Sequence, residues 1–184
     1  MIKTEILWES DSKTLDGKPF ITVKRARNYF IYAERGGIDS IAFILYDDNI
    51  KRFALIKEAK PPFDEAFEKE AYMKTAFGGS IDTDTETYKQ ICQQEVLEES
   101  GYKVPLERIW NTGETVVSTQ MSQICYTYMV DVTGIEKTEK AEYEMNDTEE
   151  NVIWMTYNEL MDLGEWKSLY IANLAIFRGY IECK

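Results

Sequence analysis

The chain has 184 residues and a formal net charge of −12, and it contains no histidine. Its length suits one domain with a substantial core. The acidic balance argues against a broad nucleic-acid-binding surface, where clustered basic side chains normally supply the affinity. Without histidine, Ser-His-Asp machinery and histidine-ligated zinc are excluded, so acid–base chemistry falls to carboxylates, lysine, tyrosine or metal-bound water.

Nothing in the sequence indicates a membrane or secreted protein. No uninterrupted apolar run approaches the roughly 18 residues needed to cross a bilayer, and the first residues lack the basic-then-apolar pattern of a signal peptide. Cys92, Cys125 and Cys183 are widely spaced and form no Cys-x-x-Cys pair, which favours reduced thiols over disulfides or a zinc site. We therefore expect a cytoplasmic location and no membrane partner.

Short apolar and aromatic segments, separated by turn residues, predict strands in the N-terminal half. The expected strands are Ile2 to Trp8, Phe20 to Lys24, Asn28 to Ala33, Ser40 to Tyr46 and Arg52 to Lys57. Asp47-Asp48-Asn49 is expected to form the hairpin turn between the last two, and Pro61-Pro62 to end the final strand.

A helix is expected from Thr85 or Glu86 to Ser100, with Thr85 as its N-cap and Gly101 just past its end. Its inner face is expected to carry Tyr88, Ile91, Cys92 and Val96. Beyond it, strands are expected at Ile109 to Val117, Gln123 to Val132 and Val152 to Met155, with a polar loop from Thr133 to Asp147. Tyr157 to Leu163 and Ser168 to Ile181 predict two closing helices, the second amphipathic.

Three carboxylates, Glu95, Glu98 and Glu99, fall within about one turn of the expected central helix. They repel one another, and Glu98 and Glu99 also face the negative end of the helix dipole. A hard divalent cation such as Mg²⁺, which takes oxygen ligands, would relieve both penalties. The alternative interpretation is a solvated acidic face without a ligand.

The segment from Gly78 to Tyr102 resembles the Nudix hydrolase signature, G-x5-E-x7-R-E-U-x-E-E-x-G-U, in which U is a bulky apolar residue. From Glu86 onward the spacing matches without a gap. Two features depart from the signature: six residues instead of five separate Gly79 from Glu86, and Gln94 stands where the family has arginine. In the family this arginine helps to hold a metal-binding glutamate, and an amide offers no charge for that role. The resemblance therefore implies the fold more strongly than it implies catalysis.

By this resemblance the chain is an α+β protein with a Nudix-type α/β/α sandwich, a mixed β-sheet and an N-terminal β-strand extension. Residues 1–184 would form a single Nudix hydrolase domain, with residues 1–35 as a dimerisation element of a homodimer. The order of features is most similar to the ADP-ribose pyrophosphatase branch, in which a strand ends in a basic residue plus proline, as at Lys60-Pro61. That branch often has a proline where Val117 stands here.

The function implied by the resemblance is Mg²⁺-dependent (or Mn²⁺-dependent) hydrolysis of a nucleoside diphosphate linked to another moiety. ADP-ribose and nucleotide sugars are substrates of this type, and a mononucleotide is released. Glu95 and Glu99 would hold the metal, Glu98 would share it or activate water, and the Gly79 carbonyl would complete the ligand set.

The resemblance also implies roles outside the signature. Either Glu149 or Glu150 would add a metal ligand or the general base, with a solvated acidic loop as the alternative. Lys60 would contact a phosphate, and Arg27 would reach the diphosphate from the same or the partner chain, with plain surface charge as the alternative for both. The cluster of Tyr29, Phe30 and Tyr32 would stack a base or pack in the core.

Two other functional classes remain open from the sequence. One is a Nudix-fold nucleotide-binding or regulatory protein with weak or no hydrolase activity, which the loss of the motif arginine favours. The other is an acidic interaction protein of unrelated fold, in which the match to the signature is due to chance.

Overall fold

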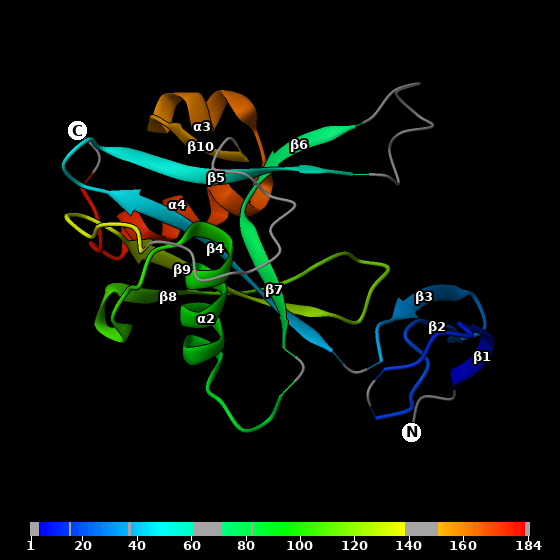
Figure 1. The fold of residues 1–184 in the computed structure, drawn as a ribbon. Helices are drawn as coiled ribbons and strands as arrows, with labels where there is room; N and C mark the ends of the chain where they lie inside the picture. Colours follow the sequence, from blue (N-terminus) through cyan, green and yellow to red (C-terminus); the bar gives the residue numbers. More distant parts are fainter. Residues whose placement is uncertain are drawn as a thin grey trace.

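The computed structural model describes residues 4–14, 16–36, 38–60, 71–81, 83–138 and 151–182. A small N-terminal sheet lies to one side of the main body (Figure 1). It consists of the antiparallel strands β1 (Thr4–Glu9), β2 (Thr22–Ala26) and β3 (Phe30–Glu34). Two hydrogen bonds fasten the end of β3 to a loop of the main body: Ala33 N donates to the Gln120 carbonyl at 2.8 Å, and Ser122 N donates to the Ala33 carbonyl at 3.0 Å.

The main body is built on a seven-stranded mixed sheet of order β10-β5-β4-β9-β8, with β6 paired to β5 and β7 paired to β4. Its strands are β4 (Asp39–Asp47), β5 (Arg52–Ala59), β6 (Tyr72–Thr75), β7 (Phe77–Ile81), β8 (Ile109–Val116), β9 (Ile124–Asp131) and β10 (Val152–Met155). Strand β4 lies at the centre. Its first half pairs with β7 and its last residues with β5, both antiparallel, while β9 runs parallel along its other edge.

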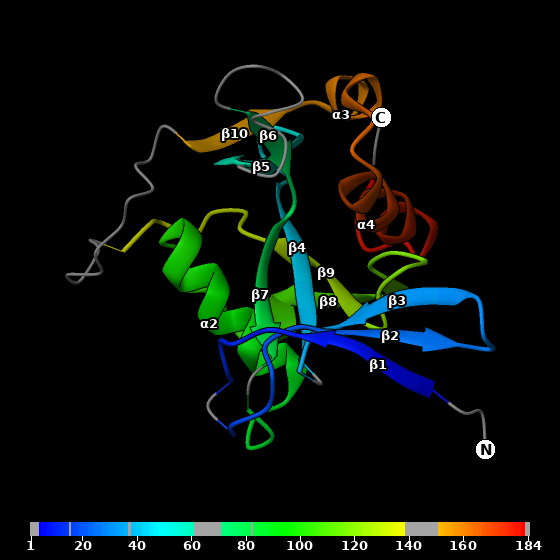
Figure 2. The ribbon, with the colours of Figure 1, turned by 90° about the vertical axis from the view of Figure 1, so that its right-hand side faces the viewer.

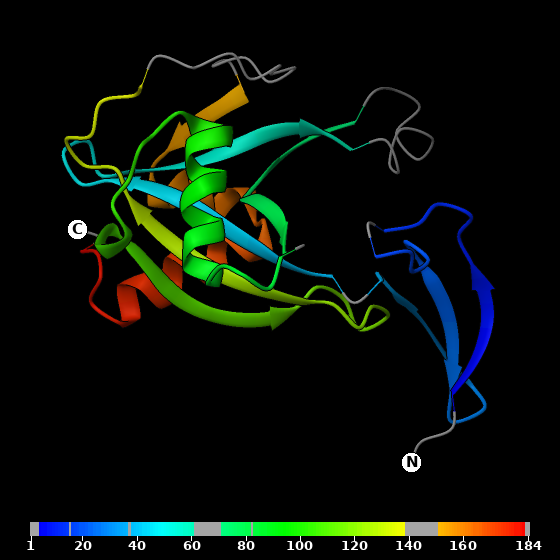
Figure 3. The same cartoon turned by 60° about the horizontal axis from the view of Figure 1, so that its bottom comes forward.

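Helices cover both faces of this sheet. Helix α2 (Tyr88–Ser100) lies on one face, and α3 (Tyr157–Leu163) and α4 (Trp166–Phe177) lie on the other (Figures 2 and 3). A short 3-10 helix, η2 (Leu106–Arg108), leads into β8. The result is an α/β/α sandwich with a mixed sheet, as the sequence predicted.

The two cores follow from alternation along β4, since successive side chains of a strand point to opposite faces. Ile41, Phe43 and Leu45 are buried with residues of α2, whereas Ala42 and Ile44 are buried with residues of α4. Both sets are at most 2% exposed. A strand covered on both faces needs a continuous apolar run, and Ile41 to Tyr46 supplies it.

Most expected elements are confirmed to within a few residues, and α3 has the expected bounds. Strands β6 and β7 were not expected. The N-cap assignment to Thr85 is wrong, because α2 begins at Tyr88 and is capped by Thr87. The second closing helix begins at Trp166 and ends at Phe177, before Ile181. Residues 61–70 and 139–150, including Pro61-Pro62 and most of the expected polar loop, lie outside the described residues.

No helix in the described part of the chain combines the length and the apolar character required to span a bilayer.

Candidate functional site

Helix α2 is fixed at both ends by capping residues. Thr87 forms a capping box with Gln90: the Thr87 hydroxyl accepts a hydrogen bond from Gln90 N, and the Gln90 side chain accepts one from Thr87 N. Such reciprocal bonds satisfy helix-end amides that have no partner within the helix. At the other end Gly101 adopts a left-handed conformation with φ of 76°, which glycine tolerates best, and its N–H bonds to the Leu97 carbonyl. The three motif glutamates therefore lie in the last two turns of a well-capped helix.

The Glu95 carboxylate packs directly against Gly79 of strand β7. A Cβ atom added at Gly79 would lie 2.8 Å from Glu95 Cγ and would overlap the Glu95 carboxylate itself. Only glycine leaves room for this approach, which brings a carboxylate of α2 against the backbone of β7. Of the predicted metal ligands, the structure thus places Glu95 and Gly79 together.

Glu99 lies on the same side of α2 as Glu95, whereas Glu98 is exposed. Cys92 lies one turn before Glu95, and its pKa is raised well above the usual value by burial first and then by the negative charges of Glu95 and Glu99. The Oε2 atom of Glu99 is buried. Within the described residues, however, no group of three or more acidic, cysteine or histidine side chains is arranged to hold a metal ion.

Gln94 forms a hydrogen bond with Glu86, the first glutamate of the signature. Gln94 Nε2 donates to Glu86 Oε1 at 2.6 Å. Glu86 lies in the loop before α2, so this bond ties that loop to the second turn of the helix. An amide supplies one uncharged donor here, where a guanidinium could donate two charge-assisted bonds.

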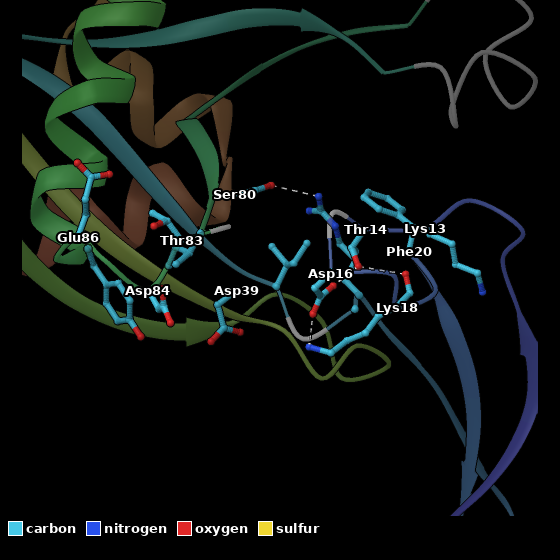
Figure 4. A pocket seen from close by; sticks show the side chains of 15 residues that line it. Lys13, Thr14, Asp16, Lys18, Phe20, Asp39, Ser80, Thr83, Asp84 and Glu86 are labelled. Atoms are coloured by element: carbon cyan, nitrogen blue, oxygen red, sulfur yellow. Dashed lines mark hydrogen bonds and ion pairs between the residues drawn. The ribbon is translucent and has the colours of Figure 1, made fainter.

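A cleft of about 880 Å³ separates the N-terminal sheet from the start of α2 (Figure 4). Its wall on the N-terminal side carries Lys13, Lys18, Phe20 and Arg35. Its opposite wall carries residues of β4, β7, the loop before α2 and the first residue of α2, among them Asp39, Ser80, Asp84, Glu86 and Tyr88. The cleft adjoins the glutamates through β7, because Ser80 lines it and the preceding residue, Gly79, contacts Glu95.

Arg35 connects the two walls of the cleft. Its Nη2 donates to Ser80 Oγ at 3.1 Å, and its guanidinium lies 5.0 Å from the centre of the Phe20 ring. Its Nε is buried and has no hydrogen-bond partner among the described residues. Sequence reasoning missed this residue, since an arginine before two glycines carries no local signal of a binding site.

Tyr88 was also missed, since it was assigned to the inner face of the helix. That assignment is wrong: Tyr88 is 39% exposed and lines the cleft, while Ile91, Cys92 and Val96 are buried as expected. Tyr88 is the first residue of α2, directly after the N-cap Thr87, and this end of the helix borders the cleft.

Other predicted site residues lie elsewhere. Lys60 forms an ion pair with Glu58, and its pKa is lowered by burial and by the charge of Lys167 on α4. Arg27 occupies the turn between β2 and β3, and neither it nor Lys60 lines the cleft of its own chain. Glu149 and Glu150 lie outside the described residues. The Tyr29, Phe30 and Tyr32 cluster does not line the cleft either, and Tyr29 is 74% exposed.

Comparison with protein-family models matches residues 38–174 to the NUDIX domain, so the chain belongs to the Nudix family. A crystal structure of an ADP compounds hydrolase is similar over 97% of this chain and 94% of that chain, with a TM-score of 0.61 and 16% identity. A Nudix hydrolase from Nitrosomonas europaea is similar over 77% of this chain and 88% of that chain, with a TM-score of 0.52 and 16% identity. No curated protein sequence matches the chain. The structural likenesses support the α+β Nudix fold, and the family supports a Nudix hydrolase.

Proposed function

We propose that this protein is a Mg²⁺-dependent or Mn²⁺-dependent hydrolase of a nucleoside diphosphate linked to another moiety, of the ADP-ribose or nucleotide-sugar type. The contact of the Glu95 carboxylate with Gly79 carries the proposal, because it brings a motif glutamate of α2 against the strand that borders the cleft. The structural likeness to an ADP compounds hydrolase supports this substrate class and the ADP-ribose pyrophosphatase branch.

The residues present fit a hard divalent cation. Glu95, Glu99 and the Gly79 carbonyl are all oxygen donors, which Mg²⁺ and Mn²⁺ prefer. We assign the metal to these three groups, with Glu98 as a further ligand. When bound, the metal would neutralise phosphate oxygens and lower the pKa of the attacking water.

Proton transfer falls to carboxylates, since the chain has no histidine. Glu98 is exposed on the turn that carries Glu99, so it can accept a proton from the attacking water. Glu149 and Glu150 are the other candidates for the general base. Water would add to one phosphorus of the diphosphate as the bridging P–O bond breaks, which gives a mononucleotide and a phosphorylated remainder.

A coupled turnover screen tests this proposal. Nucleotide sugars, ADP-ribose, dinucleotides and nucleoside triphosphates are incubated with the protein and Mg²⁺, and released monophosphates are converted to inorganic phosphate by a phosphatase. We expect Mg²⁺-dependent phosphate release from one or more diphosphate-linked compounds, abolished by EDTA added before the phosphatase step. Turnover confined to triphosphates would contradict the substrate class.

Gln94→Arg is expected to raise kcat about tenfold, the scale on which orientation losses commonly act. A guanidinium would pair with Glu86 through charge-assisted bonds in place of the single amide donor at 2.6 Å. Gln94→Glu is the matched control, because it puts a like charge beside Glu86 and should lower kcat.

The readouts for this pair of variants are kcat and the melting temperature. A Gln94→Arg protein that melts lower and turns over no faster would show that the site is tuned to glutamine, since an ill-matched charge is costly.

A second candidate function is nucleotide binding without appreciable hydrolysis. Two observations favour it: Gln94 replaces the motif arginine, and the described residues contain no ready-made three-ligand metal cluster. This candidate predicts that nucleotides raise the melting temperature while the turnover screen stays negative.

We further infer a homodimer formed through the N-terminal sheet. Strand β1 is exposed along its whole length, and Ile6, Trp8 and Tyr29 are 58%, 55% and 74% exposed. A two-fold interface would bury these side chains and could bring Arg27 of one chain to the cleft of the other. Light scattering at micromolar concentration is expected to give twice the chain mass of 21.4 kDa. A monomeric mass that does not change when β1 is deleted would contradict the dimer.

We also place the protein in the cytoplasm. Cys92 and Cys125 are buried free thiols, which agrees with a reducing compartment. Fractionation of cells that produce the protein would test the location.

A further inference from the structure

Tyr88 combines exposure to the cleft with a fixed orientation. It is the first residue of α2, it is 39% exposed and it lines the cleft. Its ring lies 4.2 Å, centre to centre, from the ring of Tyr126, with an angle of 38° between the ring planes. Tyr126 comes from β9, packs against the buried cluster beneath α2 and does not line the cleft. Tyr88 thus packs against Tyr126 and stays partly exposed in the cleft.

The interaction with Tyr88 also shows in the pKa of Tyr126. That pKa is raised to about 12, first by the adjacent Tyr88 side chain and then by burial. The Tyr126 phenol is therefore protonated and neutral at physiological pH. An aromatic ring already held by packing against a second ring loses little conformational freedom when a ligand stacks on it, which favours binding.

The charges of the cleft indicate what kind of molecule would bring a flat ring to Tyr88. Lys13, Lys18 and Arg35 line the wall on the N-terminal side, where Lys18 is paired with Asp16 (Figure 4). The Arg35 guanidinium lies over the Phe20 ring. Lysine and arginine side chains are the usual contacts of phosphate groups. The opposite wall carries Asp84 and Glu86, which are close in sequence to Tyr88 and suit the hydrogen-bond donors of a base. A molecule with phosphate at one end and a planar, amino-bearing ring at the other matches both walls.

We propose that Tyr88, supported by Tyr126, is the stacking platform for the base of a nucleoside phosphate bound in this cleft. This assignment deepens the proposed function and rests on it for the identity of the substrate class. Stacking on an aromatic side chain is tolerant of base identity, because every base has a π-face. The platform therefore distinguishes a nucleotide from a plain sugar phosphate more than it distinguishes one base from another.

Equilibrium binding in EDTA, where no turnover occurs, tests the assignment with AMP and ribose 5-phosphate as probes. Wild type should bind AMP more tightly than ribose 5-phosphate. Tyr88→Ala should weaken AMP binding about tenfold or more, the scale of base–aromatic stacking, and leave ribose 5-phosphate binding unchanged. Tyr88→Phe keeps the ring and should keep most of the affinity for AMP.

Tyr180→Ala is the matched control. Tyr180 is 36% exposed and stacks on Trp110 with ring centres 5.4 Å apart, but it does not line the cleft. Loss of the Tyr180 ring should leave the affinities for AMP and for ribose 5-phosphate unchanged. If Tyr88→Ala does not fold, Tyr88→Leu replaces it, because leucine fills much of the space without offering a π-face.

Three results would overturn the assignment: no AMP binding by wild type, unchanged AMP binding by the Tyr88→Ala or Tyr88→Leu variant, or equal weakening of AMP and ribose 5-phosphate. The turnover screen separates this outcome from failure of the proposed function. Tyr88-dependent AMP binding without Mg²⁺-dependent turnover would retain the platform and reject the hydrolase. Mg²⁺-dependent turnover without Tyr88-dependent AMP binding would retain the hydrolase and reject the platform.

Discussion

Glu99→Gln is expected to lose most of the rise in melting temperature that Mg²⁺ or Mn²⁺ produces in the wild type. A ligand that binds only the folded state stabilises it by RT ln(1 + L/Kd), where L is the free ligand concentration, so weaker binding gives a smaller rise in melting temperature. The substitution keeps the size of the side chain and removes the charge that would hold the cation beside Glu95. Because a metal ion contributes several kcal/mol of charge stabilisation, turnover should also fall about 100-fold or more.

The measurement is a thermal melt with added Mg²⁺ and with EDTA. Glu107→Gln is the matched control, since Glu107 is an exposed glutamate of η2, outside the signature, and its change should leave the Mg²⁺ effect intact. The Oε2 atom of Glu99 is buried, so the substitution can also shift stability in EDTA. The difference between the melting temperatures with Mg²⁺ and with EDTA therefore isolates the effect of the metal. Equal Mg²⁺ stabilisation of Glu99→Gln and wild type would remove Glu99 from the metal site.

Gly79→Ala is expected to displace the Glu95 carboxylate and to destabilise the fold by about 1 kcal/mol, because the end of a flexible, half-buried glutamate can move aside at less cost than a packed core side chain. The new Cβ would lie 2.8 Å from Glu95 Cγ and closer still to the carboxylate atoms. Backbone strain does not contribute, because Gly79 is not among the glycines with positive φ. Alanine is otherwise no worse than glycine in a strand, so the contact with Glu95 accounts for the loss.

A double-mutant cycle with Glu95→Ala tests this cause by chemical denaturation. In the Glu95→Ala background the obstructing atoms are gone, and Gly79→Ala should cost much less or nothing. The same cost in both backgrounds would show that the Gly79–Glu95 contact does not decide the stability. Turnover of Gly79→Ala should fall together with Mg²⁺ stabilisation, because both depend on the position of Glu95.

Short-range patterns in the sequence determined most of the fold. The apolar segment from Ser40 to Tyr46 predicted a buried strand, and β4 is that strand. The structure shows that it is buried on both faces. Gly101 predicted the end of the central helix, where its left-handed conformation closes α2. The spacing of Glu95, Glu98 and Glu99 set their places on one helix, and the match to the Nudix signature gave the fold class. These features depend on neighbours within a few residues, which is what periodicity and capping rules describe.

Contacts between segments remote in sequence decided the other features of the fold and of the cleft. Strand β7 is short and contains two adjacent glycines, so its local sequence gives a weak strand signal, and it forms because Asp39 to Phe43 of β4 supply its hydrogen-bond partners. The cleft likewise joins Lys13, Arg35, Ser80 and Tyr88, which are remote in sequence. Only the packing of the N-terminal sheet beside β7 and α2 brings them together. The sequence by itself therefore determined the family, the central helix and its glutamates, whereas the tertiary structure decided which other side chains share the cleft with them.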